Sequence, residues 1–576
     1  MTPWQVLVDM IEEQEVEMVF GLGDNYINML AGEKSDMLAV NVRHESSAPF
    51  MAMAYSRLSG NVGVCSGSQG PGTANLIPGT LEAHSGHTPL VMPCHSSPLS
   101  TSGRGEFQEC DQVGMMEPVT KWSARVTDSG RLPWYVQRAF RNAIAGSPGP
   151  VYLDLPDDVM GEGPLRTEGR DNGKELSTPD DHDKATRSRL QADVKSIQEA
   201  LEILIEADRP LVIFGNGSVF SRAFASAEKL VDELKLPFLT TPGGRGLIPE
   251  SHPLALGVSG RYRTEPARIY QESADLIFTV GSSNEAFQTG GWQHMPAEAD
   301  YMQLDIKPEA IGRSWQPDHH LIGDARTVME QLLDMFETRK KSRSERIAKM
   351  KEDREAVAAE IKEEKEKFFD QVQQEKAALS RPLLARQLLP HASEIFGQEA
   401  ILVNENGSQD IWSYFYPYFQ VESRLGCIPV AEQTCMGIGV VGAIAASLTE
   451  PDRPVLCVAG DGAFQMYMQE MATAVQYEAG CTWLVLNNSG LGWIRAKQQR
   501  AGFSQKSTEF TAQPDLAPVA ENFGCLGLQV EEPDELRPAL SSALSANKRG
   551  QPALIDCRLE YEPDMSHLDD GKWWQI

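Results

Sequence analysis

Residues 455–488 constrain the fold of this chain more than any other segment. They contain two apolar, strand-like runs with a helical stretch between them, and the first run ends in Gly-Asp-Gly while the second ends in Asn-Asn. A strand, a helix and a second strand in this order are typical of a parallel pair. The carboxyl ends of parallel strands meet at one edge of a sheet, where open α/β sheets bind ligands. We therefore expect Asp461 and Asn488 to lie side by side at such an edge.

These two side chains are chemically suited to a metal site. Carboxylate and amide oxygens are ligands that Mg²⁺ prefers, usually in company with phosphates. Gly460 and Gly462 would let the backbone approach a phosphate closely. The alternative interpretation is a tight turn capped by Asp461, with an unrelated Asn-Asn turn.

The alternation of short strands with longer helical stretches continues through the whole chain. At 576 residues the chain is too long for one hydrophobic core and fits about three or four domains. The pattern predicts an α/β fold of three successive parallel-sheet domains. The strands are expected at residues 17–20, 38–42, 61–66, 89–93, 151–155, 209–215, 236–240, 276–280, 301–304, 400–403, 455–459, 482–487 and 553–557.

Two polar segments separate these domains. One is a linker rich in polar residues, and the other is dominated by Lys, Arg, Glu and Ala without Gly or Pro, which predicts a solvent-exposed connecting helix with i,i+4 ion pairs. A partner-binding coiled coil is the alternative for the second segment, although its apolar a/d positions are sparse. The predicted boundaries are 1–165 for the first domain, 166–190 for the linker, 191–336 for the middle domain, 337–380 for the charged connector and 381–576 for the third domain.

Charge and composition exclude several classes of partner. The net charge of −29 argues against a nucleic-acid surface and against an anionic membrane face. The acidic N-terminal segment does not resemble a signal peptide, and the apolar run at 437–448 is too short to span a bilayer, so we interpret it as a buried helix. The nine cysteines include no CxxC pair, which indicates reduced thiols and a cytoplasmic protein.

The Gly-Asp-Gly and Asn-Asn pair at this spacing resembles the diphosphate and metal motif of thiamine diphosphate (ThDP) enzymes. The resemblance implies three domains of PYR-like, middle and PP-like type. It also implies that Mg²⁺ is held by the side chains of Asp461 and Asn488 and by the main-chain carbonyl of Gly490.

A second feature of that family is a glutamate, from another domain, that activates the cofactor. Glu45 follows the strand at 38–42, and residues 68–75 are similar to the family's Gly-Pro-Gly segment. The resemblance implies that Glu45 shares a proton with N1′ of the aminopyrimidine, which leads to the C2 ylide and, after CO₂ loss, to an enamine. Burial would raise the pKa of such a glutamate. The alternative for Glu45 is an acid stabilised by a helix N-terminus.

Further segments resemble the acetolactate synthase-like branch of the family over all three blocks. Residues 106–109 and 118–122 resemble a segment whose glutamine, here Gln108, lines the active site. Residues 434–437 resemble the segment in which a methionine, here Met436, supports the V shape of the cofactor and in which the carbonyl of Thr434 accepts the 4′-amino group. A plain core role is the alternative for Met436. The implied cofactor-binding set is Gly70, Asn75, Asn406, Gly407, Ser408, Thr434, Met436, Gly460, Asp461, Gly462, Ala463, Asn488 and Gly490.

The chain also departs from that branch. Phe287 occupies the place of an arginine that binds the acceptor, and Lys497 occupies the place of a substrate-selecting tryptophan. Arg495 or Lys497 could replace the missing arginine, and both could equally be solvated cations. The glycine-rich loop after the first strand differs as well. The substrate candidates are Gly23, Asp24, Asn25, Trp493, Arg495 and Lys497, while His44, His84 and His87 are interpreted as structural.

The resemblance implies a ThDP- and Mg²⁺-dependent carboligase or decarboxylase that acts on a 2-oxo acid such as pyruvate. The alternatives are simple decarboxylation, cleavage of a diketone or acyl-CoA, or a non-catalytic ThDP-binding homologue. In this family the two halves of the active site meet across a subunit interface, which implies a homodimer or homotetramer. Whether the middle domain binds FAD, ADP or neither stays open.

Overall fold

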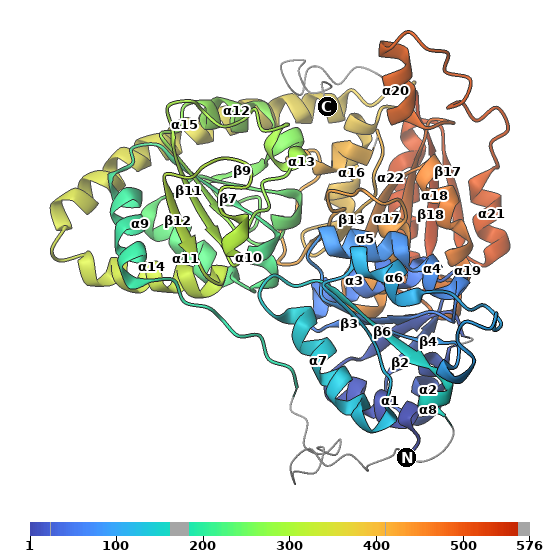
Figure 1. Cartoon of the computed structure of the whole chain (residues 1–576). Helices are drawn as coiled ribbons and strands as arrows, with labels where there is room; N and C mark the ends of the chain where they lie inside the picture. Colours follow the sequence, from blue (N-terminus) through green and yellow to red (C-terminus); the bar gives the residue numbers. More distant parts are fainter. Residues whose placement is uncertain (24, 162–183, 409, 563–576) are drawn as a thin grey trace.

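The computed structural model describes residues 1–23, 25–161, 184–408 and 410–562, which form three α/β domains (Figure 1). Each domain is built on a sheet of six strands. Every pair of neighbouring strands in the described sheets is parallel. The predicted fold class is therefore confirmed.

The first domain carries helices on both faces of its sheet (Figure 1). Its strands are β1 (Met18–Gly21), β2 (Leu38–Asn41), β3 (Gly63–Ser66), β4 (Leu90–Ser96), β5 (Trp122–Arg125) and β6 (Pro150–Pro156). Its helices are α1 (Pro3–Glu13), α2 (Tyr26–Lys34), α3 (Ser47–Ser59), α4 (Pro71–Asn75), α5 (Ile77–Ser85), α6 (Gln112–Met116), α7 (Leu132–Ile144) and α8 (Asp157–Met160).

The middle domain has the same layered architecture. Its strands are β7 (Pro210–Phe214), β8 (Phe238–Thr240), β9 (Ala255–Val258), β10 (Leu276–Val280), β11 (Asp300–Asp305) and β12 (His319–Ile322). Its helices are α9 (Val194–Glu206), α10 (Asn216–Phe220), α11 (Phe224–Leu234), the 3₁₀ turn η6 (Gly260–Tyr262), α12 (Glu265–Glu272), α13 (Ala286–Thr289) and α14 (Ala325–Arg339).

The third domain follows a long helix, α15 (Ser344–Ala377). Its strands are β13 (Ile401–Asn404), β14 (Cys427–Ile428), β15 (Val455–Gly460), β16 (Cys481–Asn487), β17 (Leu526–Val530) and β18 (Ala553–Arg558). Its helices are α16 (Ala385–Phe396), α17 (Ile438–Thr449), α18 (Asp461–Tyr467), α19 (Met471–Gln476), α20 (Gly492–Arg500), α21 (Leu516–Phe523) and α22 (Pro533–Asn547).

The sheets of the first and third domains share one strand order, and the middle domain has another. The orders are β2-β1-β3-β4-β6-β5 in the first domain and β14-β13-β15-β16-β18-β17 in the third. The middle sheet runs β12-β11-β10-β7-β8-β9, which is the dinucleotide-fold order read from the opposite edge. All three domains therefore share the same layers and parallel strands, but only the first and third domains share the same strand order.

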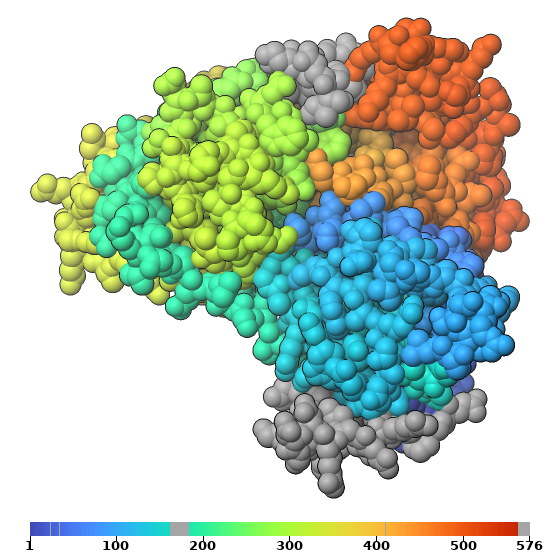
Figure 2. All heavy atoms as spheres, viewed as in Figure 1, coloured from blue at the N-terminus to red at the C-terminus, as the bar shows by residue number. Residues whose placement is uncertain are grey.

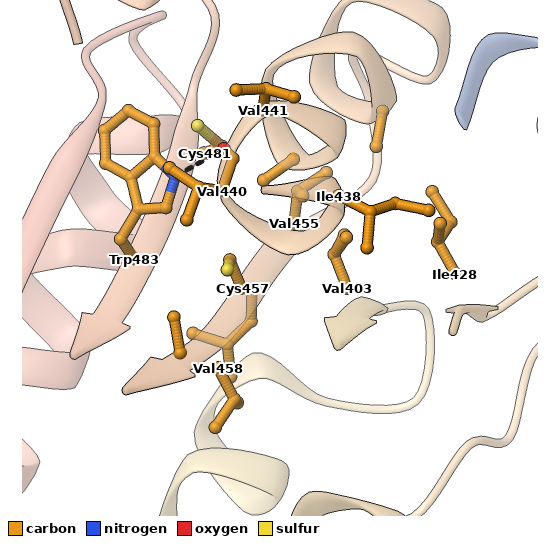
Figure 3. Close-up of a cluster of buried hydrophobic side chains, with 14 of the residues drawn as sticks. Val403, Ile428, Ile438, Val440, Val441, Val455, Cys457, Val458, Cys481 and Trp483 are labelled. Carbon is orange, nitrogen blue, oxygen red and sulfur yellow. Dashed lines mark hydrogen bonds between the residues drawn. The ribbon is translucent and has the colours of Figure 1, made fainter. Parts of the chain in front are cut away.

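The first and third domains share one hydrophobic core. Helix α17 is buried along almost its whole length, as its apolar sequence predicts, and it lies between the sheet of its own domain and α3 of the first domain. Figure 3 shows the part of this core where the Trp483 ring packs near α17. The Trp483 indole Nε1 donates a hydrogen bond to the carbonyl of Val440 over 2.8 Å. The two domains are therefore joined by burial of apolar surface.

The middle domain contacts both of the other domains (Figure 2). A buried arginine of the first domain, Arg57, forms hydrogen bonds with the middle and third domains. Arg57 is 5% exposed and comes from α3. Its Nη1 donates to Asn216 Oδ1 over 2.8 Å and its Nη2 to the Gly243 carbonyl over 3.0 Å, both in the middle domain. Its Nε donates to the carbonyl of Cys427 in the third domain over 2.7 Å.

The charged connector forms a helix, as predicted, but only one face of it is exposed to solvent. Helix α15 buries Ile347, Met350, Val357 and Ile361 against the middle domain. Arg354 is also buried, and its Nη1 donates to the Leu234 carbonyl over 2.6 Å. The exposed face carries the expected i,i+4 ion pairs, such as Lys362 with Glu366 and Lys367 with Glu363.

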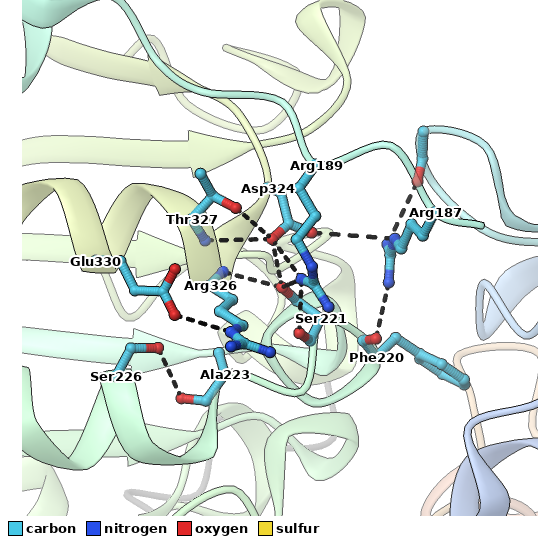
Figure 4. A network of polar contacts seen from close by, with 11 residues as sticks. Arg187, Arg189, Phe220, Ser221, Ala223, Ser226, Asp324, Arg326, Thr327 and Glu330 are labelled. Carbon is cyan, nitrogen blue, oxygen red and sulfur yellow. Dashed lines mark hydrogen bonds and ion pairs between the residues drawn. The ribbon is translucent and has the colours of Figure 1, made fainter.

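The described end of the predicted linker is anchored on the middle domain. Residues 166–183 lie outside the described residues, as do 162–165 and 563–576 of the predicted outer domains. Figure 4 shows Arg187 and Arg189 around Asp324. Asp324 accepts from Arg189 Nη1 over 2.9 Å and from Ser221 Oγ over 2.8 Å.

The predicted strands are present, and the strands that the sequence did not predict all lie at sheet edges. These are β5, β9, β12, β14 and β17. The nine cysteines are free, and seven of them are buried. Among the described helices, none combines the length and the apolar character needed to cross a membrane.

Candidate active site

The ends of β15 and β16 bring the predicted metal ligands together. The two strands pair in parallel up to Gly460 and Leu486, so the residues that follow them lie at the same sheet edge. Asp461 is 1% exposed, and its Oδ2 accepts from the backbone N–H of Gly490 over 3.1 Å. Asp461 therefore lies next to the segment that follows Asn487, as the sequence predicts.

The donor set at this edge fits a divalent cation. Asn488 Oδ1 is buried and has no hydrogen-bond partner among the described residues. No cationic side chain of the described part of the chain forms an ion pair with Asp461. Burial raises the pKa of Asp461 to about 6, against the opposing effect of the backbone N–H groups that donate to it. A buried carboxylate and an orphaned amide oxygen are the pair of ligands that a hard cation such as Mg²⁺ would satisfy.

A glutamine that the sequence analysis did not select orients Asp461. Gln513 Nε2 donates to Asp461 Oδ2 over 2.9 Å and to Asn487 Oδ1 over 3.4 Å. It lies in the loop before α21, with no motif around it, so no pattern in the sequence points to it. A residue that donates a hydrogen bond to a metal-binding carboxylate, without binding the metal itself, fixes the orientation of that carboxylate.

Asp461 and Asn488 line a cavity of about 360 Å³. Every cofactor-binding residue predicted in the third domain contributes to its wall. These residues are Asn406, Gly407, Ser408, Thr434, Met436, Gly460, Asp461, Gly462, Ala463, Asn488 and Gly490. Residues that are up to 84 positions apart in the chain, from Asn406 to Gly490, are thus collected around one space large enough for part of a cofactor.

The segment between β14 and α17 is held in an unusual backbone conformation. Thr434 has φ 50°, a left-handed value that is uncommon for a β-branched residue. Its carbonyl accepts from Asn406 Nδ2 over 3.4 Å at the cavity wall. Strained residues of this kind cluster at functional sites, where they aim a particular group.

Glu405, which the sequence analysis also missed, fixes this segment. Its Oε2 accepts from the N–H groups of Gly437 over 3.0 Å and Gly439 over 2.9 Å, at the start of α17. It lines the cavity and is fully buried, and burial raises its pKa to about 7 although the backbone donors lower it. The only signal in the sequence is an acid directly after an apolar strand.

The first-domain half of the predicted site is built around Glu45. Glu45 is 7% exposed and lies between β2 and α3. Its Oε2 accepts from Asn75 Nδ2 over 3.0 Å, and a Cβ on Gly72 would lie 3.4 Å from its Oε1. The hydrogen-bond partner of this carboxylate is thus the Asn75 side chain rather than the N-terminal N–H groups of α3.

The loop that carries Glu45 is positioned by the third domain of the same chain. Glu470 is fully buried and accepts from the N–H of Arg43 over 3.0 Å and of His44 over 3.1 Å. Ser47 Oγ donates to it over 2.8 Å. Glu470 is a further residue that sequence reasoning missed, because the loop that it holds is more than 400 residues away in the chain.

Gly70 and Gln108 lie near each other on the first domain. Gly70 has φ 61°, and a Cβ on it would lie 2.6 Å from the Gln108 carbonyl. Gln108 is exposed. None of Glu45, Gly70, Asn75 and Gln108 is among the residues that line the cavity of the third domain. Within one chain, these predicted residues of the first domain therefore do not contribute to the wall of the cavity that holds Asp461.

The predicted substrate residues fall into three places. Trp493 and Lys497, on α20, line the cavity together with Arg261, Tyr262 and Phe287 of the middle domain. Arg495 is absent from that lining, and its Nη2 pairs with Glu509 over 3.0 Å.. At the end of β1, Asn25 is buried and caps α2, Gly23 is exposed, and Asp24 lies outside the described residues.

The histidines that the sequence analysis set aside lie apart from this cavity. His44 Nδ1 and Ser46 Oγ are 2.7 Å apart. Burial lowers the pKa of His87 to about 3 and also lowers the pKa of His84. None of the three lines the cavity that holds Asp461.

Three parallel sheets, one of which has a cavity at its carboxyl edge, define an α/β protein of the class that binds ligands at such edges. Comparison with known families is more specific. Residues 1–115 match the N-terminal TPP binding domain of the thiamine pyrophosphate enzymes, residues 197–332 match the central domain, and residues 406–557 match the C-terminal TPP binding domain. The chain belongs to the thiamine pyrophosphate (ThDP) enzymes, with all three domains in the family order.

Similar proteins are found among the curated sequences. The chain is 28% identical to a probable acetolactate synthase large subunit of Methanococcus aeolicus, over 98% of this chain and 93% of that protein. It is 28% identical to the acetolactate synthase isozyme 3 large subunit of Escherichia coli, over 96% and 94%. It is 27% identical to the putative thiamine pyrophosphate-containing protein YdaP of Bacillus subtilis, over 98% and 92%.

Proposed function

We propose that this chain is a ThDP- and Mg²⁺-dependent enzyme that removes CO₂ from a 2-oxo acid such as pyruvate and ligates the remaining acyl unit to a second carbonyl compound. The cavity that gathers Asp461, Asn488 and residues 406–408 carries this proposal. The similarity to acetolactate synthase large subunits supports it. ThDP bound there would supply a carbon nucleophile for the 2-oxo acid carbonyl and an electron sink for the loss of CO₂.

The residues of this chain divide the remaining tasks. Asp461, Asn488 and the carbonyl of Gly490 hold Mg²⁺, and residues 406–408 contact the diphosphate. The Thr434 carbonyl accepts the 4′-amino group, and Met436 supports the bent cofactor. Glu45 holds a proton on its carboxyl group against N1′ of the aminopyrimidine, with Asn75 orienting that carboxyl group.

Product analysis tests the reaction. The holoenzyme with ThDP, Mg²⁺ and pyruvate is expected to release CO₂ and to form acetolactate, and omission of either cofactor should abolish both. Asp461→Ala is expected to abolish Mg²⁺-supported ThDP binding. An Asp461→Ala protein that binds both cofactors normally would refute the metal site.

Glu45→Gln is expected to keep ThDP binding while CO₂ release falls by about 10²-fold or more, because the amide cannot transfer the proton. Calorimetry measures the binding and CO₂ release measures the turnover. Glu33→Gln, an exposed position on α2, is the matched control and should change neither. Full turnover by Glu45→Gln would contradict the assigned role.

We also propose that the active unit is a homodimer or homotetramer in which Glu45 of one subunit reaches the cavity of its partner. The absence of Glu45 from the cavity wall of its own chain supports this arrangement. Mixing inactive Glu45→Gln and Asp461→Ala subunits should restore about a quarter of the activity, because half of the random dimers carry one intact site of two. No recovery in verified mixed oligomers would place both residues in one chain's site.

Simple decarboxylation, or cleavage of a diketone or acyl-CoA, is a second candidate. Phe287 and Lys497 in the cavity wall favour it, since both depart from the acetolactate synthase pattern. Acetaldehyde as the sole product from pyruvate would favour the decarboxylase. Tight ThDP binding without turnover across a panel of 2-oxo acids would favour a non-catalytic homologue.

We further propose a cytoplasmic location, supported by the nine free cysteines. FAD is not part of the proposal. The absorption spectrum of the cofactors released on denaturation decides whether a flavin accompanies ThDP.

A further inference from the structure

The cofactor cavity carries two cationic side chains that come from different domains. Arg261 belongs to η6 of the middle domain and Lys497 to α20 of the third, and both line the cavity. The middle domain thus contributes a cation, together with Tyr262 and Phe287, to a cavity whose remaining lining residues belong to the third domain. A ligand with an anionic group beyond the diphosphate is the chemistry that such a lining suits.

Arg261 is held in place by aromatic rings. Its Cζ lies 4.3 Å from the ring centroid of Phe287 and 5.8 Å from that of Trp493. The side chain is 5% exposed, and burial lowers its pKa. Moving a guanidinium out of water costs free energy, and an arginine at the protein surface would avoid this cost. The two rings restrict where the guanidinium can lie, and bidentate recognition of a carboxylate depends on the orientation of the guanidinium.

The backbone around Arg261 is equally fixed. Gly260 has φ 68°, and a Cβ there would lie 2.0 Å from the carbonyl of Phe287. The Tyr262 ring stacks on Tyr414 of the third domain, with centroids 4.4 Å apart. The N–H of Phe287 donates to Glu432 over 2.9 Å. Neighbouring elements of two domains therefore define where Arg261 stands.

The charged surroundings of Arg261 include one acid that offsets its charge. Glu432 interacts electrostatically with Arg261 but is absent from the lining of the cofactor cavity. Arg495, the other cation of α20, is paired with Glu509 and lies outside that lining. Arg261 and Lys497 are thus the cations that the described residues place in the cavity wall.

We propose that Arg261 is the specificity-determining residue that binds the carboxylate of the acceptor 2-oxo acid, with Phe287 and Trp493 orienting its guanidinium. This inference rests on the proposed function and names its acceptor class. In the ligation step the electron pair left on the acyl carbon by CO₂ forms a C–C bond with the acceptor's carbonyl carbon, whose π electrons become an alkoxide that takes one proton. The hydroxyl on the acyl carbon then gives up a proton as that carbon's carbonyl re-forms and its bond to the cofactor breaks, so no external oxidant or reductant is needed. The acceptor carboxylate stays intact and serves only for binding.

A competition between matched acceptors tests the inference. The holoenzyme receives pyruvate as donor together with 2-oxobutyrate and propanal, which differ by the carboxylate. R261Q is expected to lower the ratio of acetohydroxy acid to acyloin by about 10- to 100-fold, the loss of a charge-assisted hydrogen-bond pair. R261K keeps the positive charge but lacks the two parallel N–H donors of the guanidinium, so its product ratio should lie between those of the wild type and R261Q. R268Q, which replaces a half-buried arginine of α12 that pairs with Glu272, should match the wild type. An unchanged product ratio in R261Q overturns the proposal.

A binding measurement separates failure of this inference from failure of the proposed function. If the wild type releases no CO₂ from pyruvate, the proposed reaction fails, whereas oxamate and neutral oxamide still report on carboxylate recognition. Titration calorimetry of the loaded protein is expected to show oxamate binding at least tenfold tighter than oxamide in the wild type and R268Q, but not in R261Q. R261K supplies the same comparison if R261Q does not fold. Equal oxamate affinity in wild type and both Arg261 variants overturns the proposal.

Discussion

Single buried or half-buried polar residues set the geometry of the cavity, and most of them act on another residue. Gln513 holds Asp461, Glu405 holds the start of α17, and Glu470 holds the loop of Glu45. Each bonds at least one partner that is distant in the sequence. Such a residue has no local pattern, because its function depends on which loops the fold brings to it.

Gln513→Leu is expected to lower Mg²⁺ affinity about tenfold, because the Asp461 carboxylate loses the partner that orients it. Calorimetric titration of Mg²⁺ in the presence of ThDP measures this. Gln529→Leu, on the exposed side of β17, is the control. Equal Mg²⁺ affinity in both variants would show that Asp461 needs no such support.

Glu405 makes stability depend on pH. Its pKa is raised from 4.5 to about 7 in the folded protein, so the folded state binds more protons than the unfolded state between these values. Its contribution is fully present below about pH 4.5 and is lost as the pH rises through about 7. Glu405→Gln lacks this slope and is expected to gain about 3 kcal/mol relative to wild type between pH 5 and pH 8. Thermal unfolding across that range measures it, and parallel curves would exclude the effect.

At the scale of elements, the strands fall into two groups. The central strands, such as β15 and β16, are continuously buried apolar runs, and the sequence predicted them because both faces are covered by helices. The edge strands pair on one side only. β5 and β17 are half-exposed and β14 has two residues, so their sequences carry no comparable signal.

Helix α17 shows how an element serves two domains. Its sequence predicted burial, but not that α3 of the first domain covers one side. Trp483→Phe is expected to destabilise the protein by about 2 kcal/mol, from the lost hydrogen bond to Val440 and the space left by the smaller ring. Calorimetric unfolding measures the change. Trp134→Phe, at an exposed position, should cost less, and an equal effect would contradict this account.

At the scale of the whole molecule, polar contacts from Arg57 hold the three domains together. Its guanidinium donates to acceptors on four residues, Cys427, Asn216, Gly243 and Arg245, and the last three belong to the middle domain. Because the cavity wall includes Arg261 and Phe287 of the middle domain, the position of the middle domain also shapes the cavity.

Arg57→Leu is expected to destabilise the assembly by at least about 3 kcal/mol, since several buried acceptors lose their donor. The middle domain should then unfold in a separate transition in scanning calorimetry. Arg326→Leu, which breaks one exposed i,i+4 pair, should change stability by under about 0.5 kcal/mol. A single unshifted transition for Arg57→Leu would show that apolar contacts alone join the domains.

The sequence by itself determined the three α/β domains, their central strands and the pairing of Asp461 with the Asn488 segment. These follow from local order, because a strand, a helix and a strand place their ends at one edge whatever surrounds them. Only the tertiary structure decided which topology each sheet has, that Glu45 does not contribute to the cavity wall of its own chain, and that Arg261 and not Arg495 enters the cavity wall. Those outcomes depend on packing between domains, where each side chain's position is set by residues hundreds of positions away.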